Sequence, residues 1–259
     1  MNFNPGLDIT PVHQTMTFRY GDDCFGPEVE TRYLDDIRSS LRDPECDGPA
    51  IVYSIAMDVG KRSHRALLEK MHLLYGVVMY AAGRLGEEPI RSQGHIHRIS
   101  SASQSSTPEI YEIWEGEGVI YMQENGDDDP GRCFAVSARA GEVVIVPPGW
   151  THSTISANPS IPLVFGAWCD REYGFEYEKV RSHKGIAWFP LFDADGTLKW
   201  EPNVHYTKSE LICKLPEQYP ELGIVPGEAI YSTFEKNPDT FLYVPYPQRK
   251  KDVWVDFIP

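Results

Sequence analysis

The chain has 259 residues and a formal charge of −14, with 38 acidic against 24 basic side chains. A field of this sign repels nucleic acids and anionic membranes, so we expect neither as a partner, and a phosphorylated ligand would need local positive charge in its site. The five cysteines are scattered without a Cys-x-x-Cys pair. This spacing predicts reduced thiols in a cytoplasmic protein, and no apolar stretch is long enough to cross a bilayer.

The first third of the chain predicts an arm followed by two strands and two short helices. Residues 1–31 are polar and interrupted by glycine and proline, which predicts an extended arm. A helical pattern follows over residues 32–42, and a brief helix is expected over residues 65–72. Two apolar segments rich in β-branched and aromatic residues, 50–57 and 73–80, predict strands.

The centre of the chain predicts strand after strand. Short apolar segments there are separated by Gly, Pro, Asn or Asp, and they cover residues 109–114, 118–123, 133–136, 142–146 and 163–169. Short strands with glycine-marked corners favour a jelly-roll barrel over alternating βαβ units. The serine-rich residues 100–107 predict a mobile loop between strands.

The C-terminal part of the chain differs in amino-acid composition from the centre. Eight prolines fall within the final 58 residues. They argue against a packed helical domain and predict an extended tail that lies over the barrel or over a partner subunit. We therefore divide the chain into an N-terminal arm (1–31), a barrel domain (32–204) and a C-terminal extension (205–259).

The most informative motif is a pair of histidines, His95 and His97, separated by a single residue. Alternate residues of a strand point to the same face, so the two imidazoles project together, about 6.6 Å apart along the chain. Glu109 follows shortly after, and His152 lies farther downstream. Three imidazoles and one carboxylate form a set typical of a divalent transition metal, and they leave two positions of an octahedral ion open for a bidentate substrate.

These motifs resemble those of the cupin-type phosphoglucose isomerases over roughly residues 32–200. The matching segments are Ser92-Gln-Gly-His95-Ile-His97, Glu109-Ile-Tyr111-Glu-Ile-Trp114-Glu-Gly116-Glu-Gly118 with Gln123, Gly141-Glu-Val-Val-Ile-Val-Pro147-Pro148-Gly-Trp150-Thr-His152, and Glu172-Tyr173-Gly174. The resemblance implies an all-β fold. It is a cupin double-stranded β-helix, or jelly-roll barrel, with extended terminal segments and a few short helices.

The resemblance also implies roles for individual residues. The family's metal ligands fall on His95, His97, Glu109 and His152. Glu109 is in addition the family's suspected acid/base, Tyr111 and Tyr173 fall where the sugar is contacted, and Ser92 and Gly94 fall where the phosphate is held. The implied cofactor is one divalent ion, iron or manganese, with zinc and nickel as alternatives. The implied partners are a sugar phosphate and a second subunit in a homodimer.

The implied reaction is the interconversion of glucose 6-phosphate and fructose 6-phosphate, an aldose–ketose isomerisation. A metal that chelates O1 and O2 polarises the carbonyl, and Glu109 can then move a proton between C2 and C1 through a cis-enediol. A carboxylate bound to a cation is a poorer base, so a hydride shift that needs no base stays open.

The sequence departs from the family pattern at several positions. Gln93 replaces a lysine, Gly149 replaces an aromatic hydroxyl residue, and the gap between His97 and Glu109 is five residues longer. Arg171 falls in the place of a histidine. An arginine can bind phosphate bidentately, so Arg171 is a candidate phosphate ligand, with Arg91 and Arg98 as alternatives.

Two other functions stay open at this point. Three histidines and one glutamate also suit the iron or copper site of a cupin oxygenase that activates O₂. A non-catalytic cupin that binds sugar phosphates is the other alternative, because changes such as Gly149 and Arg171 can leave binding intact while catalysis is lost.

Overall fold

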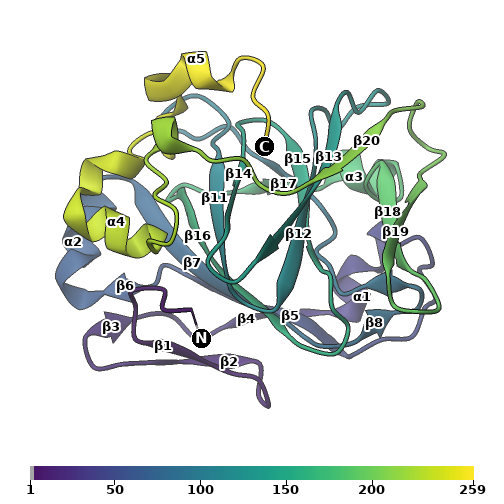
Figure 1. The fold of residues 1–259 in the computed structure, drawn as a ribbon, viewed down its shortest axis with the longest axis horizontal. Helices are drawn as coiled ribbons and strands as arrows, with labels where there is room; N and C mark the ends of the chain where they lie inside the picture. Colours follow the sequence, from purple (N-terminus) through teal and green to yellow (C-terminus); the bar gives the residue numbers. More distant parts are fainter. Residues whose placement is uncertain (1–2) are drawn as a thin grey trace.

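Two β-sheets form the body of the protein (Figure 1). The structure is a computed structural model that describes residues 3–259. The six-stranded sheet has the order β14-β11-β16-β7-β5-β4, and the four-stranded sheet has the order β15-β12-β13-β20. The strands of the larger sheet are β4 (Glu30–Tyr33), β5 (Ile51–Met57), β7 (Leu73–Tyr80), β11 (Glu109–Glu115), β14 (Val143–Val146) and β16 (Leu163–Asp170). Those of the smaller sheet are β12 (Glu117–Gln123), β13 (Cys133–Arg139), β15 (Thr151–Ser156) and β20 (Leu211–Lys214).

The central strands cross repeatedly between the two sheets, as in a jelly roll, although β12 and β13 are adjacent in the same sheet. Strands β11, β14 and β16 lie in the larger sheet, whereas β12, β13 and β15 lie in the smaller one. All pairings are antiparallel except that of β13 with β20. The predicted all-β jelly-roll fold is confirmed.

The strands predicted from apolar segments are present, with ends that differ by at most three residues from the prediction. Strand β13 continues to Arg139, three residues beyond the predicted end. Strand β15 was missed, because its sequence Thr-His-Ser-Thr-Ile-Ser has no alternation of apolar and polar residues. It is nevertheless fully buried, since it pairs with β12 along six residues.

The predicted helices are shorter than their patterns. The segment 32–42 begins with the end of strand β4 and then forms α1 (Leu34–Ile37) and the 3-10 helix η1 (Arg38–Ser40). Asp36 accepts a hydrogen bond from the Tyr33 backbone N–H at 2.8 Å, which fixes the start of α1. The second helix, α2 (Arg65–Lys70), follows the 3-10 helix η2 (Arg62–His64).

Short two-stranded pairs and a helix surround the two sheets. Within the predicted N-terminal arm, residues 9–20 form a hairpin. The pairs are β1 (Ile9–Val12) with β2 (Thr17–Tyr20), β3 (Cys24–Phe25) with β6 (Gly60–Lys61), β8 (Arg84–Leu85) with β9 (Glu88–Pro89), β10 (Ile96–His97) with β17 (Phe175–Glu176), and β18 (Trp188–Phe192) with β19 (Leu198–Pro202). Helix α3 (Glu178–Ser182) follows β17.

The C-terminal segment contains short helices, where the sequence predicted an extended tail. They are η3 (Pro220–Leu222), α4 (Ile230–Lys236), η4 (Pro238–Phe241), η5 (Pro247–Lys250) and α5 (Lys251–Trp254). Prolines occupy the first turn of η3, η4 and η5, where the missing N–H costs no hydrogen bond. The prolines therefore start helices here, and α4 lies beside α2 against the larger sheet (Figure 1).

The larger sheet is covered on both faces. Its inner face contributes Tyr80, Tyr111 and Phe165 to the core of the barrel. Its outer face contributes Tyr75 and Trp168 to a second core, which the C-terminal helices complete. This double coverage explains why β7 and β16 are continuous apolar segments without alternation. The three-part division at residues 31 and 204 stays a prediction.

Within the described residues, no helix has the length and apolar character needed to span a membrane.

Candidate metal centre

Three separate parts of the fold bring the four predicted metal ligands together. His95 and His97 lie at β10, Glu109 begins β11, and His152 lies in β15. His95 and His152 exchange both backbone hydrogen bonds, at 3.0 and 2.9 Å, so a β-bridge sets their spacing. One donor atom from each of the four side chains lies within 4.8 Å of all the others.

Backbone carbonyls determine which ring nitrogens are free. The Nδ1 of His97 lies 2.8 Å from the Thr107 carbonyl, and the Nδ1 of His152 lies 3.1 Å from the Trp150 carbonyl. A carbonyl oxygen only accepts, so both Nδ1 atoms carry the proton and a neutral ring presents a bare Nε2 to the cluster. The Nε2 of His95 is buried without a hydrogen-bond partner, as expected of a ligand atom.

Glu109 lies at the centre of the cluster. Its Oε2 is 3.1 Å from His97 Nε2 and 3.3 Å from His152 Nε2, and it accepts a 2.6 Å hydrogen bond from the Tyr111 hydroxyl. The Cys169 thiol donates to the other oxygen, Oε1, at 3.0 Å. Bare nitrogens facing a carboxylate oxygen repel it, so positive charge has to lie among these atoms. The buried group therefore suggests a metal site.

The electrostatic environment gives most of these groups the protonation states that a metal requires. Burial raises the pKa of the Glu109 carboxyl, but contacts from His152 and His97 outweigh it and hold that pKa well below its usual range. Burial and the neighbouring imidazoles lower the pKa of His95 strongly, and burial also lowers that of His152. For His97 burial acts in the same direction, but Glu109 raises its pKa overall. An ionised carboxylate beside neutral imidazoles is a ready ligand set.

A cavity beside the cluster, which we call the central cavity, is lined by the inner face of the larger sheet and by three more of the predicted site residues. His95 and Glu109 line it together with Ser92, Tyr111 and Tyr173. Tyr173 is 43% exposed at this cavity, whereas Tyr111 is buried. Metal ligands and hydroxyl groups thus face one space.

Gly94 lies between Ser92 and His95 in the chain, and its backbone requires glycine. Its φ is +91°, and a Cβ would come within 2.8 Å of Ile186 Cγ2. Any larger residue would displace the segment that carries Ser92 and His95.

The arginines proposed from the sequence are placed elsewhere. Arg171 donates to Asp58 Oδ1 at 2.7 Å and to the Leu73 carbonyl at 3.2 Å, and it is not among the residues that line the central cavity. Arg98 is exposed and does not line the cavity either.

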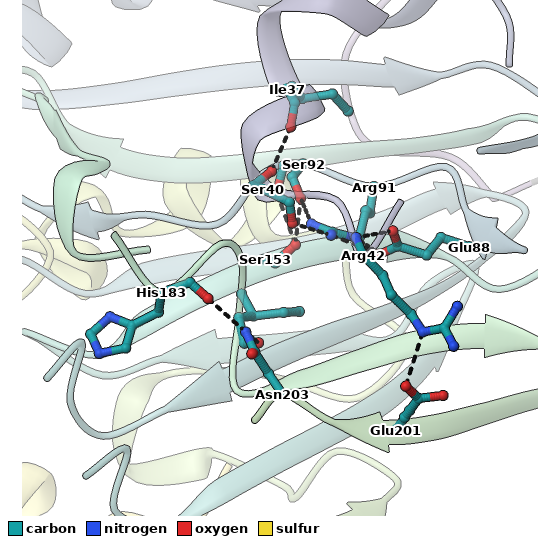
Figure 2. A network of polar contacts seen from close by, with 11 residues as sticks. Ile37, Ser40, Arg42, Glu88, Arg91, Ser92, Ser153, His183, Glu201 and Asn203 are labelled. Carbon is teal, nitrogen blue, oxygen red and sulfur yellow. Dashed lines mark hydrogen bonds and ion pairs between the residues drawn. The ribbon is translucent and has the colours of Figure 1, made fainter. Parts of the chain in front are cut away.

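Arg91 is fully buried and lies in a polar network with Glu88, Ser40 and Ser92 (Figure 2). Its Nε donates to Glu88 Oε1 at 2.7 Å, and its terminal nitrogens donate to the Ser92 carbonyl at 3.0 Å and the Ser40 carbonyl at 2.6 Å. Arg91 therefore anchors the segment that carries Ser92 from outside the cavity.

Two supporting residues were missed by the sequence. Ser106, in the loop predicted as mobile, donates to the His97 carbonyl at 2.9 Å and accepts from the Gly149 N–H at 3.0 Å. The longer gap before Glu109 was the signal that this loop is special. Cys169 gave no signal, since its contact with Glu109 depends on the pairing of β11 with β16.

The fold is that of a jelly-roll protein, and its buried ligand cluster is a candidate metal site. The family model described as glucose-6-phosphate isomerase (GPI) matches residues 41–208. This chain therefore belongs to the glucose-6-phosphate isomerase family.

Curated relatives carry the same name. The glucose-6-phosphate isomerase of Sinorhizobium medicae is 28% identical over 138 residues, which is 53% of this chain and 60% of that protein. The glucose-6-phosphate isomerase of Pyrococcus furiosus is 25% identical over 136 residues, 52% of this chain and 66% of that protein. The chain thus spans about 60% of the first relative it matches.

Solved structures resemble the chain only loosely. An oxalate oxidase structure aligns with a TM-score of 0.35 at 14% identity, covering 48% of this chain and 53% of that one. A vicilin from Corylus avellana aligns with a TM-score of 0.36 at 14% identity, covering 51% and 33%.

Proposed function

We propose that this protein is a metal-dependent aldose–ketose isomerase that interconverts glucose 6-phosphate and fructose 6-phosphate. The observation that carries the proposal is the buried group of three imidazoles and one carboxylate at a cavity rich in hydroxyl groups, inside the region that the family model matches. A sugar phosphate is also the substrate that the family name implies.

His95, His97, Glu109 and His152 would hold one divalent ion. Nitrogen and oxygen donors of this kind suit iron or manganese, with zinc and nickel as alternatives. When bound, such an ion polarises a carbonyl and stabilises the negative charge that develops on oxygen.

Glu109 is the proposed base that moves a proton between C2 and C1. Glu109 lines the central cavity, and its Oε2 accepts the hydrogen bond from the Tyr111 hydroxyl. Burial and the Glu109 charge raise the pKa of Tyr111 well above its usual range, so Tyr111 stays a neutral donor and orients the carboxylate. Tyr173, at the exposed side of the cavity, is proposed to contact the sugar.

Ser92 and Gly94 are the proposed phosphate contacts, through a hydroxyl and a backbone N–H. The Ser92 hydroxyl accepts from the Thr154 N–H at 3.2 Å and lies 3.2 Å from the Ser153 hydroxyl, so its position is fixed. We leave Arg171 out of this set, because Asp58 and the Leu73 carbonyl already hold its guanidinium.

A homodimer in the cytoplasm is also part of the proposal. Family members are commonly dimeric, and light scattering on the purified protein would measure its mass directly. A monomer that turns over sugar phosphates would remove the dimer from the proposal and leave the rest.

The test is a coupled assay on protein stripped with a chelator and then reloaded with single divalent ions. We expect no turnover of glucose or fructose 6-phosphate by the stripped protein and recovery with iron or manganese. Oxygen uptake without sugar interconversion would instead favour an oxygenase. Sugar-phosphate binding without proton exchange at C2 would favour a non-catalytic binding protein.

A further inference from the structure

A phosphorylated substrate needs a cation, and none of the three arginines proposed from the sequence lines the central cavity. Arg91 is held in a buried network by Glu88 and two backbone carbonyls (Figure 2), and Arg171 is held by Asp58. Since the whole chain carries a charge of −14, a dianionic substrate meets an unfavourable field unless positive charge lies in the cavity itself.

Arg32 supplies that charge. Among the residues that the structure describes, it is the one lysine or arginine that lines the central cavity together with His95 and Glu109. It lies on β4, the edge strand of the larger sheet, where the sequence had predicted the start of a helix.

The strand register places Arg32 on the inner face of the barrel. Arg32 pairs with Tyr53 on β5, and Tyr53 pairs with Tyr80 on β7. Directly paired residues of neighbouring strands point to the same face, so these three side chains form a row, and all three line the cavity. Tyr80 is buried in the barrel core, whereas Arg32 ends the row at the open edge of the sheet.

The guanidinium of Arg32 is partly buried and only lightly engaged. Its side chain is 24% exposed, and one of its terminal nitrogens donates to Glu30, whose side chain is 59% exposed. It also lies beside the Tyr177 hydroxyl: burial raises the pKa of Tyr177, and the Arg32 charge lowers it. A guanidinium has five N–H groups, so a pair with one exposed carboxylate leaves donors for an oxyanion.

We propose that Arg32 binds the phosphate group of the substrate in the central cavity and thereby selects phosphorylated over unphosphorylated sugars. The phosphate would exchange with Glu30 on the guanidinium, and the Ser92 hydroxyl would face the same space. This assignment rests on the proposed function. It adds the charged group that recognises the substrate, which the sequence placed at other arginines.

A second arginine near the rim provides the matched control. Arg181 donates to Gln93 Oε1 at 2.9 Å, and its guanidinium lies 5.0 Å from the centre of the Tyr177 ring. Gln93 lines the cavity but Arg181 itself does not, and Arg181 is exposed. Removal of its charge therefore changes the local field without removing a group that lines the cavity.

The experiment measures binding of sorbitol 6-phosphate and of sorbitol to manganese-loaded protein by calorimetry. The two ligands share a polyol that cannot be isomerised and differ only in the phosphate. We expect Arg32→Met to raise the Kd for sorbitol 6-phosphate by about 10- to 100-fold, because a charge-assisted bidentate contact is lost. Sorbitol binding should change less than about twofold, and Arg181→Met should change both Kd values less than about threefold.

Two further variants keep the proposal testable if Arg32→Met folds poorly. Arg32→Lys keeps the charge but loses the planar fork, so an increase in Kd of about three- to tenfold is expected. Glu30→Gln removes the competing carboxylate, so the Kd for sorbitol 6-phosphate should fall. The assignment would be overturned if Arg181→Met alone lost the preference for sorbitol 6-phosphate over sorbitol. It would also be overturned if Arg32→Met, Arg32→Lys and Glu30→Gln all left the Kd values unchanged.

The outcome separates this proposal from the isomerase proposal. Wild-type protein that binds sorbitol 6-phosphate through Arg32 but does not interconvert hexose phosphates would sustain the phosphate site and refute the isomerase. If the wild-type protein turns over fructose 6-phosphate and Arg32→Met keeps the same selectivity for phosphorylated ligands, the isomerase proposal is sustained and the phosphate site at Arg32 is refuted.

Discussion

Two buried glutamates on one strand of this protein lie in opposite chemical environments. Glu109 and Glu112 are three residues apart on β11 and therefore point to opposite faces of the larger sheet. Imidazoles surround Glu109 on the inner face and hold its pKa well below the usual range, against the effect of burial. On the outer face burial dominates and raises the pKa of Glu112 to about 8.

The partners of the two carboxylates explain the difference. Glu112 accepts hydrogen bonds from the Ile230 N–H at 2.8 Å and the Trp114 indole at 3.2 Å, both neutral donors. It connects the sheet to the start of α4, so its role is to hold the C-terminal helices in place. Glu109 instead faces groups that can carry positive charge or bind a metal. Burial of a carboxylate therefore does not by itself identify a functional site, and its partners do.

The largest expected effect is on the inner face. Glu109→Gln removes the anionic ligand and the proposed base, and loss of a general base alone costs about 10²- to 10⁴-fold in rate. We expect turnover to become undetectable and bound metal, measured by elemental analysis, to fall sharply. Glu117→Gln changes an exposed glutamate at the start of β12, the next strand along the chain, and this control should behave as wild type. Full activity in Glu109→Gln would end the assignment of this cluster.

On the outer face of the larger sheet, a substitution in the core is expected to lower stability strongly without affecting the metal cluster. Phe234 of α4 is fully buried, with its ring centre 4.9 Å from that of Trp168 and 5.7 Å from that of Tyr231. Phe234→Ala should lower the free energy of unfolding by about 3–5 kcal/mol, measured by denaturant titration, because a large cavity is left in the core.

The folded fraction of Phe234→Ala should keep its metal content and its turnover. Leu215→Ala, at a side chain that is 69% exposed, is the control and should leave stability nearly unchanged. Loss of metal from a folded Phe234→Ala protein would show that the two faces of the sheet are coupled.

The pH dependence of stability should report on Glu112. Its folded pKa of about 8 lies above the ordinary value of 4.5, so the folded state binds the extra proton between these pH values. The stabilising contribution is complete below about pH 4.5 and is lost as the pH rises toward 8, on the order of 5 kcal/mol at most. Tyr75 is the titratable neighbour that faces Glu112, and its pKa is raised well above the usual range, so it stays neutral in this window.

Glu112→Gln should remove this part of the slope. The amide can accept the Ile230 N–H, but its NH₂ group meets the Trp114 indole N–H, so the variant should be less stable than wild type near pH 5. Near pH 8.5 the two proteins should differ much less, because the wild type then carries a buried charge. Unfolding curves at several pH values measure the difference, with Glu117→Gln as the control. Parallel pH profiles for wild type and Glu112→Gln would contradict the raised pKa.

The sequence predicted those features that depend on local pattern and missed those that depend on register. Continuous apolar segments predicted β5 and β7 with nearly correct ends, and the histidine spacing predicted the ligand cluster. Strand β15 was missed because burial there comes from pairing with β12 and not from apolar side chains. Arg32 was missed because only the pairing of β4 with β5 turns it toward the cavity. The C-terminal helices were missed because proline disfavours the interior of a helix but fits its first turn, where it occurs in η3, η4 and η5.

The smallest expected effect concerns the support of Glu109. Cys169→Ala removes the thiol that donates to Glu109 Oε1 and leaves the four ligands in place. Loss of a contact that orients a metal ligand typically weakens metal binding about 10- to 100-fold, and we expect the lower end because a thiol is a weak donor. Competition with a chromophoric chelator measures the change.

Cys133→Ala is the matched control, since that thiol is also fully buried but contacts Gly131 and Ser209, away from the cluster. Cys169→Ser, which keeps a donor, should restore most of the affinity. If Cys169→Ala and Cys133→Ala bind metal equally well, the thiol only fills space, and the inner face holds Glu109 through Tyr111 and the imidazoles alone. A selective loss in Cys169→Ala would instead show that both oxygens of Glu109 are held by donors, as both oxygens of Glu112 are on the outer face.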